Sequence, residues 1–191
     1  MTKILLVGDS FAADWTIKNT TYSGWPNLLA EEFKVDNRAK AGVSEYRIWQ
    51  QLSNCNIKNY THLIISHTSP FRIPVEEHPL HGNDLLHNDC DFLYEDIKNH
   101  KSLLCVKEYF EKFFDTDYAK FVHQLIIEKQ IAYVSDQCKV LHLHHMKQDL
   151  NFIPSRSVLD FSDVFVSHKG NVNHYSKQGN QIVFETIKKW I

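Results

Sequence analysis

The stretch KILLVGDSFAADW, Lys3 to Trp15, decides the fold. Its four consecutive apolar residues, Ile4 to Val7, run directly into Gly8-Asp9-Ser10. A short, wholly apolar run of this kind is typical of a strand that is buried on both faces of a parallel sheet. Ligands of open parallel sheets bind at the carboxyl ends of the strands. We therefore expect Ser10 to lie on that edge of the sheet.

The rest of the chain alternates strand and helix patterns, which predicts a three-layer α/β/α fold with a parallel sheet covered on both sides. Further strands are expected over residues 33–37, 61–66 and 139–145, and helices over 24–33, 44–52, 118–134 and 178–191. We expect one domain over residues 1–191, with an insertion at about 74–116 after the third strand. A long connection that leaves from the ligand side of a sheet is often a lid or a binding loop. The insertion is therefore expected to cover the rim of the site.

Composition excludes several classes of protein. The formal net charge of the 191 residues is -2, so no positively charged surface that would bind nucleic acid is expected. No apolar run reaches the roughly 18 residues that span a bilayer, and the N-terminus does not resemble a signal peptide. The four cysteines are far apart in the sequence and predict reduced thiols. We expect a cytoplasmic protein with neither a nucleic acid nor a membrane as partner.

A serine near the start and a histidine near the end form a candidate reactive pair. The segment GNVNHYSKQGN places His174 in a polar loop before the last helix, with Ser176 as the expected N-cap. If a helix begins near Phe11, its free N–H groups also favour an anion beside Ser10. A serine nucleophile with a histidine base is a recurrent arrangement for acyl transfer. The alternative is that Asp9 or Ser10 only caps the following helix.

Three blocks of the sequence, LLVGDSFA, NRAKAGVSEYRI and NVNHYSKQGN, together resemble the SGNH (GDSL-type) hydrolase family. The resemblance implies a flavodoxin-like fold and serine esterase activity. It places Ser10 as the nucleophile, His174 as the base, and the backbone N–H groups of Ser10 and Gly42 as donors to the oxyanion. It implies no metal and no organic cofactor.

The third block of that family, Gly-x-Asn-Asp, is replaced by His67-Thr68-Ser69-Pro70. Ser69 stands where the family has the asparagine that donates to the oxyanion, and a hydroxyl reaches less far than a carboxamide. Loss of one such donor costs about 10²–10³ in rate. The Arg72 guanidinium would compensate if it lies near the pocket; the alternative is an ordinary surface arginine.

The last block carries a second departure, because Asn171 stands where the family has an aspartate. An amide oxygen can orient the imidazole of His174 but cannot stabilise the imidazolium by charge. Asp163 and Asp160 are the alternative acids. A protein that binds an acylated ligand with little turnover is the third reading.

The sequence thus predicts hydrolysis of a small ester, for example an acetyl group on a carbohydrate. A carbohydrate-binding protein, or an acyltransferase of the same chemistry, is the alternative. Candidates for substrate contact are Asp9, Thr68, Arg72 and Trp15.

Three further features carry less weight. A metal hydrolase using His142 and His144 is another hypothesis, although no cysteine or carboxylate completes a ligand spacing. The stretch from His78 to Asp91, which contains Asn83-Asp84, is interpreted as a polar loop. Phe110, Phe113, Phe114 and Tyr118 recur at roughly helical spacing and are interpreted as core.

Overall fold

The computed structural model describes residues 2–18, 23–81, 85–147, 152–172 and 174–191, apart from the side chains of residues 17, 18, 171 and 172. Five parallel strands form one sheet in the order β2-β1-β3-β4-β5. The strands are β1 (Lys3–Gly8), β2 (Lys34–Asn37), β3 (His62–Ser66), β4 (Lys139–His144) and β5 (Val158–Asp160). The predicted α/β class and parallel sheet are confirmed.

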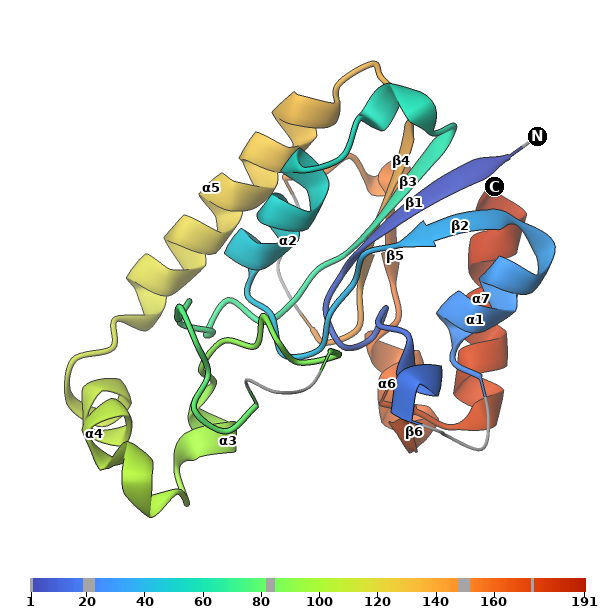
Figure 1. The fold of residues 1–191 in the computed structure, drawn as a ribbon. Coiled ribbons are helices and arrows are strands. Elements are labelled where there is room, and N and C mark those ends of the chain that lie inside the picture. The colour runs from blue at the N-terminus through green and yellow to red at the C-terminus, as the bar shows by residue number, and fades with distance from the viewer. Residues whose placement is uncertain (1, 19–22, 82–84, 148–151, 173) are drawn as a thin grey trace.

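Helices cover both faces of the sheet (Figure 1). One face carries α1 (Trp25–Glu32) and α7 (Lys177–Trp190), and the opposite face carries α2 (Glu45–Ser53) and α5 (Thr116–Val134). As predicted, Ser44 and Ser176 are the N-caps of α2 and α7, since each side chain accepts a hydrogen bond from the first turn of its helix.

Strand β1 divides its apolar side chains between two cores. Ile4 and Leu6 pack against α1 and α7, whereas Leu5 and Val7 pack against α2 and the end of α5. All four side chains are fully buried. This alternation explains the run of four apolar residues, because successive side chains of a strand point to opposite faces of the sheet.

Gly8 ends β1 in a position that no larger residue fits. Its φ is +155°, and a Cβ built on it would lie 2.6 Å from the Cβ of Ser66 on β3. From α2, the Gln51 side chain accepts from the Gly8 N–H at 2.8 Å and donates to the Gly8 carbonyl at 3.2 Å. Asp9 and Ser10 therefore leave the sheet from a fixed point.

Between β3 and α5 the chain forms the predicted insertion, which contains α3 (Tyr94–Ile97), the 3-10 turn η3 (Lys101–Leu103) and α4 (Leu104–Lys112). Its loops lie below the carboxyl ends of the strands in Figure 1. The Leu86 carbonyl accepts from the Ala41 N–H at 3.0 Å, and the Gly42 carbonyl accepts from the Asp91 N–H at 2.9 Å. These bonds join the insertion to the loop that follows β2.

Smaller elements complete the chain. They are α6 (Ser162–Ser167), β6 (Lys169–Val172), and the 3-10 turns η1 (Trp15–Lys18), η2 (Ile57–Asn59) and η4 (Ser155–Ser157). All four cysteines carry free thiols. Within the described residues, no helix is both long and apolar enough to cross a bilayer.

One expectation about the insertion is wrong in part. Phe113 and Tyr118 are 73% and 65% exposed, so neither is a core residue. With Phe114 they line a cavity on the α2–α5 side of the molecule.

Candidate active site

Ser10 and His174 meet at the carboxyl edge of the sheet, although 164 residues separate them in the sequence. The Ser10 Oγ lies 2.8 Å from the His174 Nε2. Ser10 is 8% exposed and His174 is half-buried. This is the distance that proton transfer from a hydroxyl to an imidazole requires.

Ser10 lies in a turn and not at the start of a helix. The Ala12 N–H donates to the Asp9 carbonyl at 3.1 Å, and the next helical residues are those of η1. The condition of a helix beginning near Phe11 is therefore not met, and no helix dipole faces Ser10 from that segment. The Trp15 Nε1–H donates to the Ser10 carbonyl at 2.8 Å and fixes the turn from its far side.

His174 follows β6 closely in the chain, and backbone hydrogen bonds fix the residues around it. The Gly170 N–H donates to the His174 carbonyl at 3.1 Å, and the Ser176 N–H donates to the His168 carbonyl at 2.6 Å. His174 has a φ of +60°, in the left-handed region that is uncommon for residues other than glycine. Such conformations persist only where the surrounding structure holds them.

The imidazole of His174 lies among aromatic rings. Its centroid is 4.4 Å from that of Phe11 and 6.5 Å from that of Trp15. Burial lowers the pKa of His174 to about 4, and the positive charges of Arg72 and Lys169 act in the same direction. At neutral pH the ring is uncharged and can accept the proton of Ser10.

No carboxylate among the described side chains contacts His174. Asp160 lies 3.6 Å from the His144 Nδ1, and its Oδ1 accepts from the Ser162 N–H. Asp163 lies in the first turn of α6 with no ion pair to His174. The backbone of Asn171 belongs to β6, but its side chain lies outside the described part of the chain.

A buried chain of hydrogen bonds connects the two halves of the site. The Ser66 Oγ donates to the Asp9 Oδ1 at 3.1 Å and lies 3.0 Å from the His145 Nε2. On its other side, the His145 Nδ1 lies 2.6 Å from the Tyr175 hydroxyl. Phe11 stacks on His145 at 4.4 Å with the rings nearly parallel. Asp9, which precedes Ser10, and Tyr175, which follows His174, are thereby joined through one network.

Ser66, His145 and Tyr175 were not predicted as site residues. Tyr175 follows His174 directly and His145 follows β4, but neither matches a motif. The sequence offers one signal for this network, which is that Tyr175 directly follows His174.

Asp9 belongs to this network and not to an open pocket. Its side chain is buried, and its Oδ1 accepts from the Phe11 N–H at 3.1 Å as well as from Ser66. Burial raises the pKa of the Asp9 carboxyl to about 7, although both hydrogen bonds favour the ionised form. The contacts of Asp9 support a role in holding the turn of Ser10.

Gly42 lies on the loop that joins the insertion. Its carbonyl accepts from the Arg72 Nη1 at 3.0 Å. Among the described residues, neither the Gly42 N–H nor the Ser10 N–H donates to a protein acceptor. Both donors expected for the oxyanion are therefore unpaired within that part of the chain.

Arg72 is mostly buried and is not an ordinary surface residue. Besides Gly42, its guanidinium lies 3.7 Å from the Asp96 carboxylate, and its charge lowers the pKa of both His174 and Asp9. Ser69 is half-buried, and its hydroxyl accepts from the Phe71 N–H at 3.3 Å. Thr68 is fully buried, with its N–H donating to the Glu45 Oε2 at 3.3 Å.

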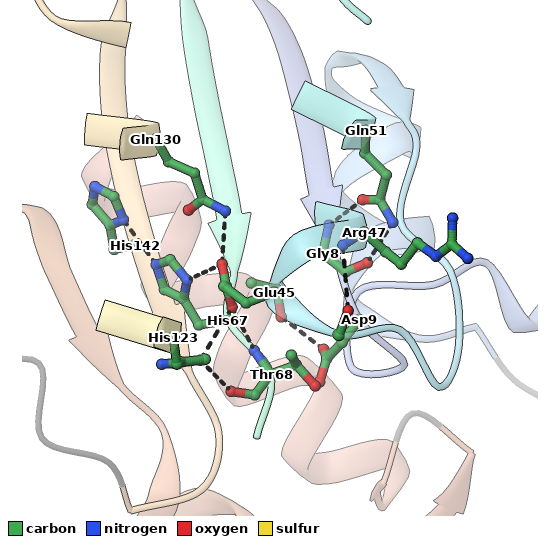
Figure 2. A network of polar contacts seen from close by, with 12 residues as sticks. Gly8, Asp9, Glu45, Arg47, Gln51, His67, Thr68, His123, Gln130 and His142 are labelled. Carbon is green, nitrogen blue, oxygen red and sulfur yellow. Dashed lines mark hydrogen bonds and ion pairs between the residues drawn. The ribbon is translucent and has the colours of Figure 1, made fainter. Parts of the chain in front are cut away.

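A second polar network surrounds Glu45 at the start of α2 (Figure 2). The Glu45 Oε1 lies 2.9 Å from the His67 Nδ1 and accepts from the Gln130 Nε2 at 2.8 Å. The His67 Nε2 in turn lies 2.9 Å from the His142 Nδ1. Burial alone raises the pKa of Glu45, but His67 and His123 together hold it well below its usual value. His67, the residue at the family's glycine position, is therefore a partner of Glu45.

The cavity noted above opens beside this network and has a volume of about 390 Å³. Ser69 and Arg72 line it on the side of β3, and Glu45 and His123 line its polar part. Most of the remaining wall is apolar or aromatic and includes Tyr46, Tyr109, Phe113, Phe114, Tyr118, Val122 and Ile126.

Asp9→Asn is expected to increase stability at neutral pH more than at acid pH. A carboxyl whose folded pKa is about 7 favours the folded state most when protonated, and this contribution declines as pH rises from about 4 to 7. Asparagine keeps the acceptor oxygen and does not titrate. Chemical denaturation should therefore show that the free energy of unfolding of the variant, relative to that of the wild type, rises by roughly 2–4 kcal/mol between pH 4 and pH 8. If the difference in free energy of unfolding between the two proteins does not change with pH, the raised pKa of Asp9 is contradicted.

Comparisons with known proteins agree with the architecture. No family model and no curated protein matches the sequence. Among solved structures, the chain is similar to that of a protein from Desulfitobacterium hafniense DCB-2 assigned to the lipolytic proteins of the G-D-S-L family. The two share 14% identity, each is covered over 100% of its length, and the TM-score is 0.54. The chain therefore has the fold that its sequence resemblance implied.

Proposed function

We propose that this protein is a serine esterase in which Ser10 is the nucleophile and His174 is the general base. The observation that carries the proposal is the 2.8 Å contact between the Ser10 Oγ and the His174 Nε2 at the carboxyl edge of the sheet. The fold shared with a G-D-S-L-family protein supports it independently.

In the proposed reaction, the Ser10 Oγ attacks the ester carbonyl while the His174 Nε2 takes the hydroxyl proton. The tetrahedral oxyanion is held by the N–H groups of Ser10 and Gly42, with Ser69 as a third donor. His174 then gives its proton to the departing alkoxide, which leaves as the alcohol. A water molecule attacks the acyl-serine, its proton passes to His174, and the acid is released as Ser10 recovers its proton.

The electrostatics of the site predict a slow reaction. A general base is most effective when its pKa is near the working pH, and the pKa of His174 is about 4. The described residues also provide no carboxylate to stabilise the imidazolium. In the family, the aspartate at the position of Asn171 would supply that charge.

The substrate is proposed to be a small ester, for example an O-acetylated carbohydrate. Its portion remote from the reacting carbonyl is proposed to occupy the cavity lined by Ser69, Arg72, Phe113 and Tyr118. Exposed aromatic side chains suit both an acyl chain and a sugar ring. With a sugar hydroxyl in place of water, the same steps would give acyl transfer.

A binding protein of low turnover is the second candidate, favoured by Ser69 and by the low pKa of His174. A fluorophosphonate probe distinguishes the two functions, because only an activated serine reacts with it. The esterase proposal expects covalent labelling at Ser10, whereas a binding protein expects none.

Ser10→Ala should reduce hydrolysis of p-nitrophenyl acetate by at least about 10³-fold without loss of folding, because the nucleophile is removed at a rim position. In the wild type, kcat/KM should rise as pH increases through about 4 and then stay flat to pH 8, since His174 must be uncharged to accept a proton. Ser53→Ala, on α2, is the matched control and should keep full activity. Turnover at the wild-type level in folded Ser10→Ala would refute this nucleophile.

Asn171→Asp should raise the esterase rate by about 10-fold or more. A carboxylate three residues before His174 would stabilise the imidazolium and move the pKa of His174 toward neutrality. Rates of p-nitrophenyl acetate hydrolysis are compared with those of Asp160→Asn and Asp163→Asn, which should match the wild type. If Asn171→Asp leaves the hydrolysis rate unchanged and Asp160→Asn or Asp163→Asn abolishes it, the residue that orients His174 is that aspartate and not Asn171.

Phe113→Ala should raise KM for p-nitrophenyl hexanoate by about 5–10-fold with kcat little changed, because contacts to a remote acyl chain act on the ground state and the transition state alike. Acetate, which is too short to reach the cavity wall, should be unaffected. Phe121→Ala is the control, since Phe121 is an exposed phenylalanine of α5 that is not among the residues lining the cavity. If Phe113→Ala and Phe121→Ala change KM equally, the cavity is not part of the substrate site.

A further inference from the structure

Three potential metal ligands meet within the insertion, and none of them belongs to the Ser10–His174 pair. His78, His81 and Cys90 each offer one ligand atom, and these atoms all lie within 4.8 Å of one another. His78 and Cys90 are buried, and His81 is half-buried. Imidazole nitrogen and thiolate sulfur are the donors that zinc-class ions prefer.

The backbone brings the two histidines together in a turn. The His81 N–H donates to the His78 carbonyl at 3.2 Å, and the two rings are 4.8 Å apart between centroids. Leu86 and Asp91, which flank Cys90, are bonded to the loop of Gly42. The three donors are therefore presented from segments that backbone hydrogen bonds already fix.

His78 supplies an independent sign that a ligand is missing. Its side chain is 1% exposed, yet the Nε2 has no hydrogen-bond partner among the described residues. The Nδ1 accepts from the Leu80 N–H at 3.2 Å, so the neutral ring carries its proton on that unpaired Nε2. A buried donor without an acceptor is costly and rare in native proteins. An ion at Nε2 would remove this cost, with the ring proton moving to Nδ1 and the contact with Leu80 given up.

We propose that His78, His81 and Cys90 form a binding site for a divalent ion of the zinc class. Tetrahedral coordination at about 2.0–2.3 Å requires ligand atoms about 3.5 Å apart, so donors that lie within 4.8 Å of one another need to close by at most about 1.3 Å. Binding would replace the thiol proton of Cys90, which is released to solvent, by a bond from sulfur to the metal. Water would complete the coordination.

The position of the site gives the ion a structural role. A Cβ built on Gly42 would lie 2.3 Å from the Cys90 Sγ, so the thiol packs directly against the loop that carries the proposed oxyanion donor. An ion on Cys90, His78 and His81 would tie the His78–His81 turn to the Cys90 segment, which packs against that loop.

The test is a titration of chelator-treated full-length protein with Co²⁺, followed by absorption spectroscopy. One equivalent of Co²⁺ should produce a thiolate-to-cobalt band in the near ultraviolet together with visible bands of tetrahedral intensity. Zn²⁺ should abolish both. Zn²⁺ at about 100 times its Kd should also raise the Tm of the metal-free protein by roughly 5 °C.

Matched variants assign the ligands. Cys90→Ser should lose the thiolate band, and His81→Ala should weaken Co²⁺ binding at least 10-fold. Cys105→Ser and His100→Ala alter exposed residues of the same insertion and should behave like the wild type. Absence of the thiolate band in the wild type overturns the proposal, whether or not the variants fold, and so does its persistence in Cys90→Ser.

Discussion

The structure depends on the burial of β1 on both faces of the sheet. Two helices on each side cover its four apolar side chains, so the strand cannot shift by one residue without exchanging the two cores. At its end, Gly8 allows β1 to pass so close to Ser66 that a methyl group would not fit. The fixed strand and the close approach together determine where Ser10 leaves the sheet.

Sequence patterns predicted the elements that bury long or regular apolar stretches, including β3 and α7. They missed β5 (Val158–Asp160) and α6 because these are too short to show a period. No helix begins at Phe11, because the Asp9 carboxyl and carbonyl hold that segment in a turn instead. Pairing between distant polar residues, such as Glu45 with His67, leaves no local signal.

Among the described side chains, no carboxylate contacts His174 to support a proton transfer from Ser10. His174 is uncharged at neutral pH, and the network from Asp9 runs through Ser66 and His145 to the Tyr175 hydroxyl. Burial in this setting disfavours every charged form, which explains why the pKa of the carboxyl rises while that of the imidazole falls. Arg72 and Lys169 are nearby positive charges, and the Arg72 guanidinium donates to the Gly42 carbonyl.

The 164-residue separation of Ser10 and His174 has a consequence for synthesis of the chain. Strand β1 emerges from the ribosome before α7, and α7, which follows His174 closely in the chain, must pack on α1. The two side chains can therefore meet only after α7 has been made. A chain that ends before α7 would contain Ser10 without the imidazole that lies 2.8 Å from it in the folded protein.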